Sequence, residues 1–287
     1  MSVVDGEARP GADVLMLVHR RAHYLALSLP RLLDSLGPRD RLWVWQNGQD
    51  PDVRRVVETH RAHDRFHALH ENADNAGLTG PTNWFWEHSS AELVGKVDDD
   101  CLVDLDWVDR LGRAHVDIPG LGVVGAWRFL DEDFVPRLAR RKIRSFEGGH
   151  RILLNLWVQG SSYLMKRECV ETVGPLTASL SFPHYCISVA ERGWDNGWLY
   201  PFVREQHLDD PRFRDSAMAT DTDLAANLPL SARLEGVRTL PQWEREMRLA
   251  ARRVQAAPYD VAAFRGWRRR ARNLRHRGRR LVRRLTR

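Results

Sequence analysis

Apolar residues in the first part of the chain form short continuous runs that alternate with longer amphipathic segments. Asp13–Val18, Leu42–Trp45 and Phe66–Leu69 have the length and composition expected of buried strands. Between the first two runs, leucines recur at helical spacing from Tyr24 to Leu36, and Gly37-Pro38 ends this pattern. The alternation of strands and helices predicts an α/β fold in which right-handed crossovers connect parallel strands.

The second part of the chain continues this alternation less regularly. Leu121–Trp127 and Leu153–Val158 are further apolar runs, and Arg167–Val173 has the pattern of a short helix. Residues 131–150 are rich in charge and glycine, which is typical either of a mobile lid or of an ordinary solvated loop. Leu240–Ala256 has the spacing of a final helix in the body of the protein.

Three consecutive aspartates, Asp98, Asp99 and Asp100, directly follow an apolar segment that we expect to be a strand. Ligands in open α/β sheets bind at the carboxyl ends of the strands, so residues after the first, second and acidic strands should converge on one crevice. Adjacent carboxylates repel one another, and a divalent cation would relieve that repulsion. Hard oxygen ligands favour Mg²⁺, Mn²⁺ or Ca²⁺ over zinc. The alternative interpretation is a solvated acidic turn that binds nothing.

The composition limits the class of protein. The chain has 287 residues, of which 43% are hydrophobic and 11 are tryptophan, as expected of a globular protein with a substantial core. It has neither an apolar run of about 18 residues nor a secretory signal pattern at its start. Its 3 cysteines are scattered, without metal-ligand spacing, which is typical of reduced thiols. We therefore expect a cytoplasmic protein.

The basic charge of the chain belongs to one end. The whole chain carries a net charge of +6, but residues 265–287 contain 12 arginines and no acidic residue, so the remainder is acidic at −6. Apolar residues of 264–287 fall on one face at helical spacing, opposite the arginines. Such a segment suits an anionic membrane surface at the inner face of the membrane. Binding to nucleic acid phosphates and an unstructured solubilising tail are the alternatives.

Four segments occur in an order and spacing that resemble a known family. They are DVLMLVHRR, the loop NADNAGLTGPTN, the segment KVDDDCLVDLDW and the later segment QGSSYLMKRECVETVGPL. Together they resemble the nucleotide-binding start, the loop before the acidic strand, the DxD motif and the acceptor-side block of family 2 glycosyltransferases. The resemblance extends roughly over residues 13–210 and implies the GT-A fold, a mixed sheet flanked by helices. We expect a GT-A domain over 13–215, a helical extension over 216–263 and the basic helical tail over 264–287.

The resemblance also implies roles for individual residues. Asp98 and Asp99 would contact the donor, and Asp100 would bind Mn²⁺ or Mg²⁺ with His207 as a second ligand. The other residues expected at the donor are His19, Arg20, Asn47, Asn75, Gly77, Asn83 and Lys96. Gly160 belongs to the acceptor-side block, and the aromatic rings of Trp194 and Trp198 are candidates for stacking on the acceptor. The metal would stabilise the charge that builds on the departing diphosphate. Positive charge could also come from Arg20, from Arg21 or from an arginine of 137–144.

The sequence departs from the family pattern at the general base. Inverting members usually carry a Glu-Asp pair whose aspartate takes the proton of the acceptor hydroxyl, and the corresponding segment here, SLSFPHYCISVAERGW, lacks it. His184, Glu191 and Asp195 are the candidates for a catalytic role. His184 could instead be structural or contact the acceptor, so the stereochemical outcome stays open.

These features predict a metal-dependent glycosyltransferase that uses a nucleotide-diphosphate sugar, with a UDP-sugar and inversion favoured. The acceptor would be an envelope glycan, a glycolipid or a small metabolite. One alternative is transfer to a modified nucleic acid that the basic tail anchors. The other is a degenerate GT-A domain that binds metal or glycan without turnover.

Overall fold

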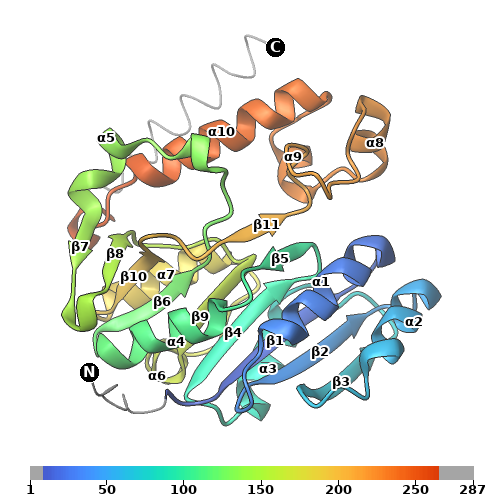
Figure 1. Cartoon of the computed structure of the whole chain (residues 1–287), viewed down its shortest axis with the longest axis horizontal. Helices are drawn as coiled ribbons and strands as arrows, with labels where there is room; N and C mark the ends of the chain where they lie inside the picture. Colours follow the sequence, from blue (N-terminus) through green and yellow to red (C-terminus); the bar gives the residue numbers. More distant parts are fainter. Residues whose placement is uncertain (1–8, 265–287) are drawn as a thin grey trace, which may run out of the picture.

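A mixed nine-stranded sheet forms the centre of the computed structural model, which describes residues 9–264 (Figure 1). The first four strands across the sheet are parallel, and β9 then runs antiparallel to both of its neighbours. In spatial order the strands are β3 (Phe66–Asn72), β2 (Arg41–Asn47), β1 (Ala12–Val18), β4 (Leu93–Asp98), β9 (Ser162–Lys166), β6 (Leu121–Gly125), β10 (Asp195–Leu199), β8 (Arg151–Leu154) and β7 (Ile143–Ser145). The predicted mixed sheet flanked by helices is confirmed.

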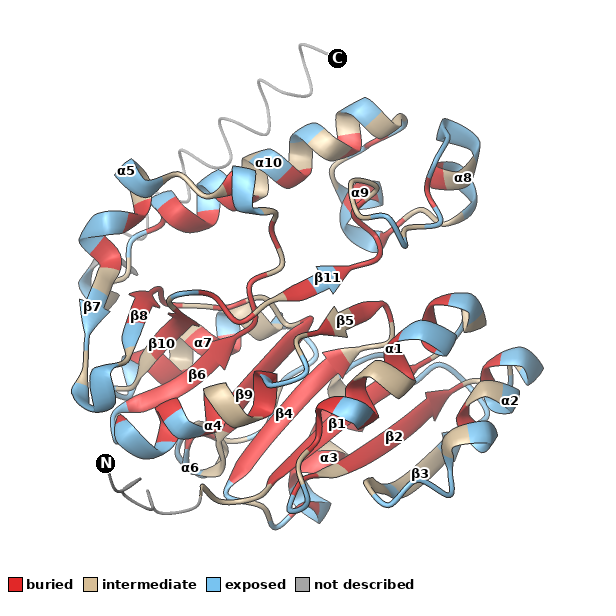
Figure 2. Ribbon diagram, viewed as in Figure 1, coloured by how far each residue is buried: buried red, intermediate tan, exposed pale blue. Residues whose placement is uncertain are grey.

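Helices cover both faces of this sheet, and each face has its own hydrophobic core. The first face carries α1 (Ala22–Ser35), α2 (Pro51–His60) and α4 (Trp107–Asp117), and the second carries α3 (Thr79–His88), α6 (Arg167–Val173) and α7 (Phe182–Glu191). In β1, Val14 and Met16 belong to the first core, whereas Leu15 and Leu17 belong to the second. Burial on both faces explains why this strand is apolar at nearly every position (Figure 2).

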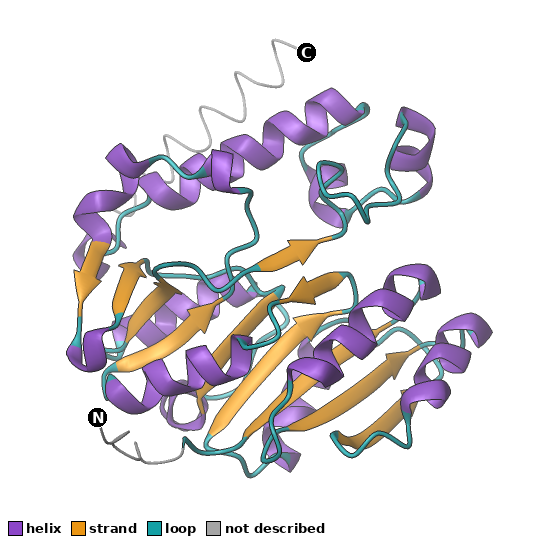
Figure 3. Ribbon diagram, in the orientation of Figure 1, coloured by secondary structure: helices purple, strands orange, loops and turns teal. Residues whose placement is uncertain are grey.

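A second, two-stranded sheet joins distant parts of the chain. β5 (Cys101–Val103) follows the three aspartates and pairs antiparallel with β11 (Glu205–His207), so that Cys101 lies opposite His207 (Figure 3). This pairing brings the 207–210 turn to the acidic turn, although about a hundred residues separate them in the sequence.

The C-terminal part of the described chain packs around a third, smaller core. It contains α8 (Asp221–Ala226), α9 (Leu230–Leu234) and α10 (Leu240–Ala256), and its central side chain is the buried Trp243. The indole Nε1 of Trp243 donates a hydrogen bond of 2.7 Å to the carbonyl oxygen of Asp209. This contact connects the third core to the turn that carries His207.

Residues 131–150 are packed against the rest of the protein and do not form a long structureless lid. They contain α5 (Pro136–Ala139), β7 and three short 3-10 helices. The buried Lys142 donates 2.9 Å hydrogen bonds to Asn155 Oδ1 and to the carbonyl oxygen of Val254 at the end of α10. Burial lowers the pKa of Lys142 to about 8. These bonds fix the segment between the sheet and α10.

The predicted basic tail, 264–287, lies outside the described residues except for its first position, and its membrane or nucleic acid contacts stay predictions. Within residues 9–264, no helix has both the length and the apolar character that crossing a bilayer requires.

His115 on α4 gives the fold a dependence on pH. The ring is buried, with its nitrogens 3.3 Å and 3.2 Å from the carbonyl oxygens of Leu121 and Leu164. Burial lowers the pKa of His115 from 6.5 to about 4, so the folded protein holds the neutral ring. Between a pH of about 6.5 and about 4, His115 therefore binds a proton in the unfolded chain but not in the folded protein.

We predict that the free energy of unfolding falls as the pH drops from about 6.5 to about 4, with up to about 3 kcal/mol due to His115. Urea unfolding at several pH values should show a smaller pH slope for His115→Gln than for the unmodified protein. The exposed His63 provides the control, since His63→Gln should keep the full slope. Equal slopes for His115→Gln and the unmodified protein would contradict the assignment.

Candidate active site

A cleft of about 680 Å³ opens at the carboxyl ends of β1, β2 and β4. On one side it is bounded by residues that follow these strands, and on the other by α8, α9 and the segment between them. Of the residues predicted at the donor or the metal, those that line it are His19, Arg20, Asn47, Asn75, Gly77, Asp98, Asp99, Asp100 and His207. The structure thus brings together segments that the sequence placed at separate strand ends.

Asp100 is the most highly connected carboxylate of the cleft. Its Oδ2 accepts a 2.7 Å hydrogen bond from Arg21, while its Oδ1 lies 3.8 Å from Nε2 of His207. Arg21 also donates a 2.6 Å hydrogen bond to Asp209 Oδ1. Burial by itself would raise the pKa of Asp100, but His207 and the guanidinium of Arg21 hold this pKa below its ordinary value. Asp100 is therefore ionised at neutral pH.

The backbone at Arg21 is unusual. With φ 67° and ψ 51° it lies in the left-handed region, and it is the only residue other than glycine with positive φ within 9–264. This conformation costs a side-chain-bearing residue roughly 1 kcal/mol. It occurs directly between β1 and α1, where the guanidinium reaches two carboxylates at once. The two ion pairs offset the backbone cost.

The other two aspartates of the triplet are held differently. Asp98 forms an ion pair with the buried Lys96, whose Nζ also donates a 2.8 Å hydrogen bond to the carbonyl oxygen of Gly160. Burial raises the pKa of Asp98 despite this partner. Burial, together with the charge of Asp100, raises the pKa of Asp99 well above its ordinary value. Within this cluster of three adjacent carboxylates, Lys96 and Arg21 are the cationic side chains that form ion pairs. Such an excess of carboxylates is expected of a site that binds a cation.

Asn47 organises the loop that forms one edge of the cleft. Its side-chain nitrogen donates to the carbonyl oxygen of Gly77 at 2.9 Å, and its side-chain oxygen accepts from the N–H of Ala76 at 2.9 Å. The backbone oxygen of Asn47 also contacts the His19 ring. Gly77, with φ 70°, occupies the left-handed region that glycine favours. Because both ends of its amide are occupied, Asn47 positions the loop more than it offers groups to a ligand.

Asp100 and His207, together with Cys101, place ligand atoms within 4.8 Å of one another. Burial and the charge of Arg128 lower the pKa of His207 to about 3, so the imidazole is neutral and able to bind a metal at neutral pH. A carboxylate oxygen and a neutral imidazole suit Mn²⁺, and the carboxylate suits Mg²⁺. Burial raises the pKa of the Cys101 thiol well above its ordinary value, so Cys101 stays protonated and is no partner for a hard cation.

The model of Glycosyl transferase family 2 matches residues 13–174, more than half of the chain. The chain belongs to this family. A solved structure with the same fold is "Mannosyltransferase PcManGT from Pyrobaculum calidifontis in complex with GDP-Man and Mn2+". It is 17% identical, with 86% of this chain and 87% of that chain covered and a TM-score of 0.54. No curated protein matches the sequence. The predicted family, fold and class of enzyme are confirmed.

Two acidic residues of this glycosyltransferase's cleft region were not predicted. Asp209 lines the cleft, and burial together with the charge of Asp100 raises its pKa to about 7. Glu205 is buried, accepts hydrogen bonds from the hydroxyls of Ser161 and Ser162, and has its pKa raised to about 8 by burial. In the sequence, the only signal was the polar stretch around His207, because burial depends on the pairing of β5 with β11.

Three predicted residues lie away from the edge of the sheet that carries the aspartate triplet. Asp195 pairs with Leu121 at the start of two parallel strands, opposite the edge where the aspartate triplet lies. Trp194 directly precedes it, and Glu191 ends α7, whose first turn lies near Gly160. This position does not support a catalytic role for Asp195 or Glu191 or an acceptor contact for Trp194, and these roles stay predictions. The sequence pattern gives no direction for β10, so the edge at which Asp195 lies follows only from the strand pairing.

Three further predicted residues have side chains that are enclosed or already hydrogen-bonded within the protein. Trp198 is 0% exposed and packs edge-to-face against Trp127, so it cannot stack on an acceptor. Asn83 exchanges two hydrogen bonds with the backbone of Leu176, of 2.9 Å and 2.8 Å, which fix α3 to the segment after α6. Lys96 is directed to Asp98 and Gly160, so it supports the aspartate triplet and does not line the cleft.

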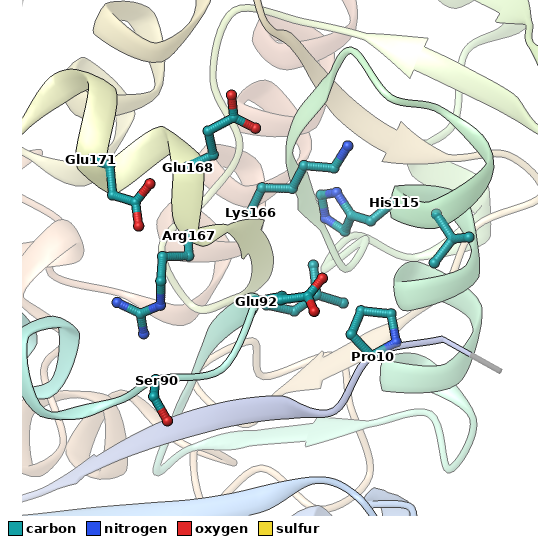
Figure 4. A pocket seen from close by; sticks show the side chains of 10 residues that line it. Pro10, Ser90, Glu92, His115, Lys166, Arg167, Glu168 and Glu171 are labelled. Atoms are coloured by element: carbon teal, nitrogen blue, oxygen red, sulfur yellow. The ribbon is translucent and has the colours of Figure 1, made fainter.

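A second hollow, of about 750 Å³, lies at the opposite edge of the sheet (Figure 4). The lysine and arginine side chains that line it are hydrogen-bonded to backbone carbonyl oxygens. Lys166 donates to the carbonyl oxygens of Ile118 and Pro119, and Arg167 donates to those of Trp86 and Ala91. These bonds hold β9 and α6 against their neighbours, which gives both side chains a structural role.

A buried ion-pair network fixes the turn that carries His207. The side chain of Arg212 is 6% exposed and pairs with Asp210 at 2.6 Å and with Asp133 at 2.8 Å. The N–H of Asp210 in turn donates a hydrogen bond of 2.8 Å to the carbonyl oxygen of His207. Gln255 of α10 donates to the carbonyl oxygen of Asp133 at 2.8 Å. The position of His207 therefore depends on a hydrogen-bonded path that reaches α10.

Proposed function

We propose that this glycosyltransferase moves a sugar from a nucleoside-diphosphate sugar to an acceptor hydroxyl, with Mn²⁺ or Mg²⁺ held by Asp100 and His207. The observation that carries the proposal is the approach of a buried, ionised carboxylate to a neutral imidazole beside two further carboxylates in one cleft. The similar mannosyltransferase, solved with GDP-Man and Mn²⁺, adds guanosine to uridine as a base to be tested.

The cleft residues suggest how the donor is oriented. His19, Asn75 and Gly77 surround the ends of β1 and β2, and we assign the nucleoside to this part of the cleft. The diphosphate would then lie toward Asp100, near the exposed Arg20, which has no ion-pair partner within residues 9–264. A bound divalent ion would neutralise charge on the departing diphosphate as a Lewis acid. The arginines at 137–144 lie on the segment fixed to α10 and do not line this cleft.

Arg21 prepares the acidic cluster for the ion. In the described structure it compensates the charges of Asp100 and Asp209, which would otherwise repel each other in a buried setting. Asp98 is compensated separately by Lys96. The site thus keeps its carboxylates in place before any ligand binds, and binding needs less reorganisation.

We expect Asp100→Asn to abolish the metal-dependent response to nucleotide. In a thermal-shift panel of UDP, GDP, TDP and CDP, one nucleotide should stabilise the unmodified protein with Mn²⁺ and little without it. Saturation at about a hundred times Kd would add roughly 3 kcal/mol of stability. The matched control is Asp106→Asn, because Asp106 is an exposed aspartate six positions later in the chain. Retention of the full response in Asp100→Asn would refute the proposed role.

The position of His184 near Gly160, at the same edge of the sheet as the aspartate triplet, supports a role as the base. His184 is exposed in the first turn of α7, which begins beside Gly160, and its Nδ1 lies 2.8 Å from the hydroxyl of Ser181. We propose that it receives the proton of the acceptor, since an imidazole can do so near neutral pH.

His184→Gln should lower kcat by about 10²-fold or more and leave the affinity for nucleotide and Mn²⁺ unchanged, because a base acts only in the chemical step. Glu191→Gln, at the far end of the same helix, serves as the control and should keep kcat. If His184→Gln retains its kcat, the base is another residue.

A further inference from the structure

The three most exposed large apolar side chains of residues 9–262 all line the same cleft. They are Leu234, Leu230 and Leu78, which are 78%, 69% and 62% exposed. Leu230 and Leu234 lie one helical turn apart on α9, and Leu78 follows Gly77 on the opposite wall. A leucine exposed singly needs no explanation, but three that face one cavity from two directions indicate a binding surface.

Their exposure is not a consequence of a loosely attached helix. Ala232, between the two leucines of α9, is fully buried in the third core with Trp243 and Met247. Trp243 also donates its hydrogen bond to Asp209, in the turn that carries His207. Tyr24 provides a second connection. Its hydroxyl donates a hydrogen bond of 3.0 Å to the carbonyl oxygen of Leu208 and accepts one of 3.0 Å from the N–H of Ala217. The two leucines of α9 are therefore held at a fixed place relative to the aspartate triplet.

The cleft has two chemically different regions. Asp98, Asp99, Asp100 and His207 form the region that suits a cation and a diphosphate. The leucines form an apolar wall that gains nothing from phosphates or sugar hydroxyls. Arg233 lies between the two leucines of α9, is exposed, and has no ion-pair partner within residues 9–264. A ligand that is complementary to this surface has a hydrocarbon portion, which contacts the leucines, next to an anionic group, which pairs with Arg233.

We propose that the acceptor is an amphiphile whose hydrocarbon chain lies on Leu78, Leu230 and Leu234 and whose anionic group meets Arg233. The reactive end of the acceptor would then face the aspartate triplet, because both regions belong to one continuous cavity. This inference rests on the proposed transfer reaction and narrows its acceptor from glycans and metabolites in general to lipid-like molecules.

The test compares the binding of butyl phosphate and decyl phosphate, below their critical micelle concentrations, by calorimetry in the absence of metal and nucleotide. Burial of a methylene is worth about 0.8 kcal/mol, so each buried methylene should tighten binding about fourfold. The unmodified protein should bind decyl phosphate at least tenfold more tightly than butyl phosphate. The double variant Leu230→Ser, Leu234→Ser should lose this difference. The control double variant Leu27→Ser, Leu105→Ser, whose exposed leucines do not line the cleft, should keep it.

Several outcomes would overturn the proposal. One is equal affinity for the two phosphates, and another is an unchanged chain-length effect in the Leu230→Ser, Leu234→Ser variant. If that variant instead weakens nucleotide binding, the leucines cover the donor. If it dissociates a dimer, they belong to a contact between copies. If it loses only binding to phosphatidylglycerol vesicles, they contact a membrane. Since the probes need neither metal nor donor, these results are independent of the Asp100→Asn test of the proposed function.

Discussion

The double ion pair of Arg21 with Asp100 and Asp209 holds the functional edge of this protein together. It connects the segment after the first strand, the aspartate triplet and the turn that carries His207, although Arg21 and Asp209 are 188 residues apart in the sequence. Two buried carboxylates without this guanidinium would carry uncompensated charge, which costs several kcal/mol. The left-handed backbone at Arg21 is the local cost of placing one cation between them. The geometry of the cleft follows from this arrangement.

The C-terminal helices extend this frame from the acidic turn to the apolar wall. Trp243 and Tyr24 hold the third core against the 207–210 turn, and Arg212 with Gln255 connects the same turn to α10. As a result, a segment outside the family match at 13–174 contributes one side of the cleft. The family-matching part supplies the aspartate triplet, and the added helices supply the apolar wall to which we assign the acceptor.

The local pattern of apolar and polar residues was sufficient to predict the order of the first helices and strands and the position of the aspartate triplet at a strand end. The run at 13–18 and the turn at 98–100 have strong signals, because a strand buried on both faces is apolar throughout and ligands collect at carboxyl ends. The direction of β10 has no such signal, so the sequence does not show that Asp195 and Trp194 lie at the edge opposite the aspartate triplet. Burial caused the remaining errors and omissions. Trp198 has an aromatic ring of the kind that stacks on sugars, but it lies in the core. The importance of Asp209 becomes visible only through its ion pair with Arg21.

The central claim is that His207 and Asp100 hold one cation beside the donor. Pulsed electron paramagnetic resonance of Mn²⁺ bound with the stabilising nucleoside diphosphate tests it most directly, because a coordinated imidazole gives a nitrogen modulation. The account predicts that this modulation is present in the unmodified protein, absent in His207→Gln and retained in His19→Gln, which changes another histidine of the cleft. A spectrum without nitrogen modulation in the unmodified protein, or one that His207→Gln leaves unchanged, would contradict it.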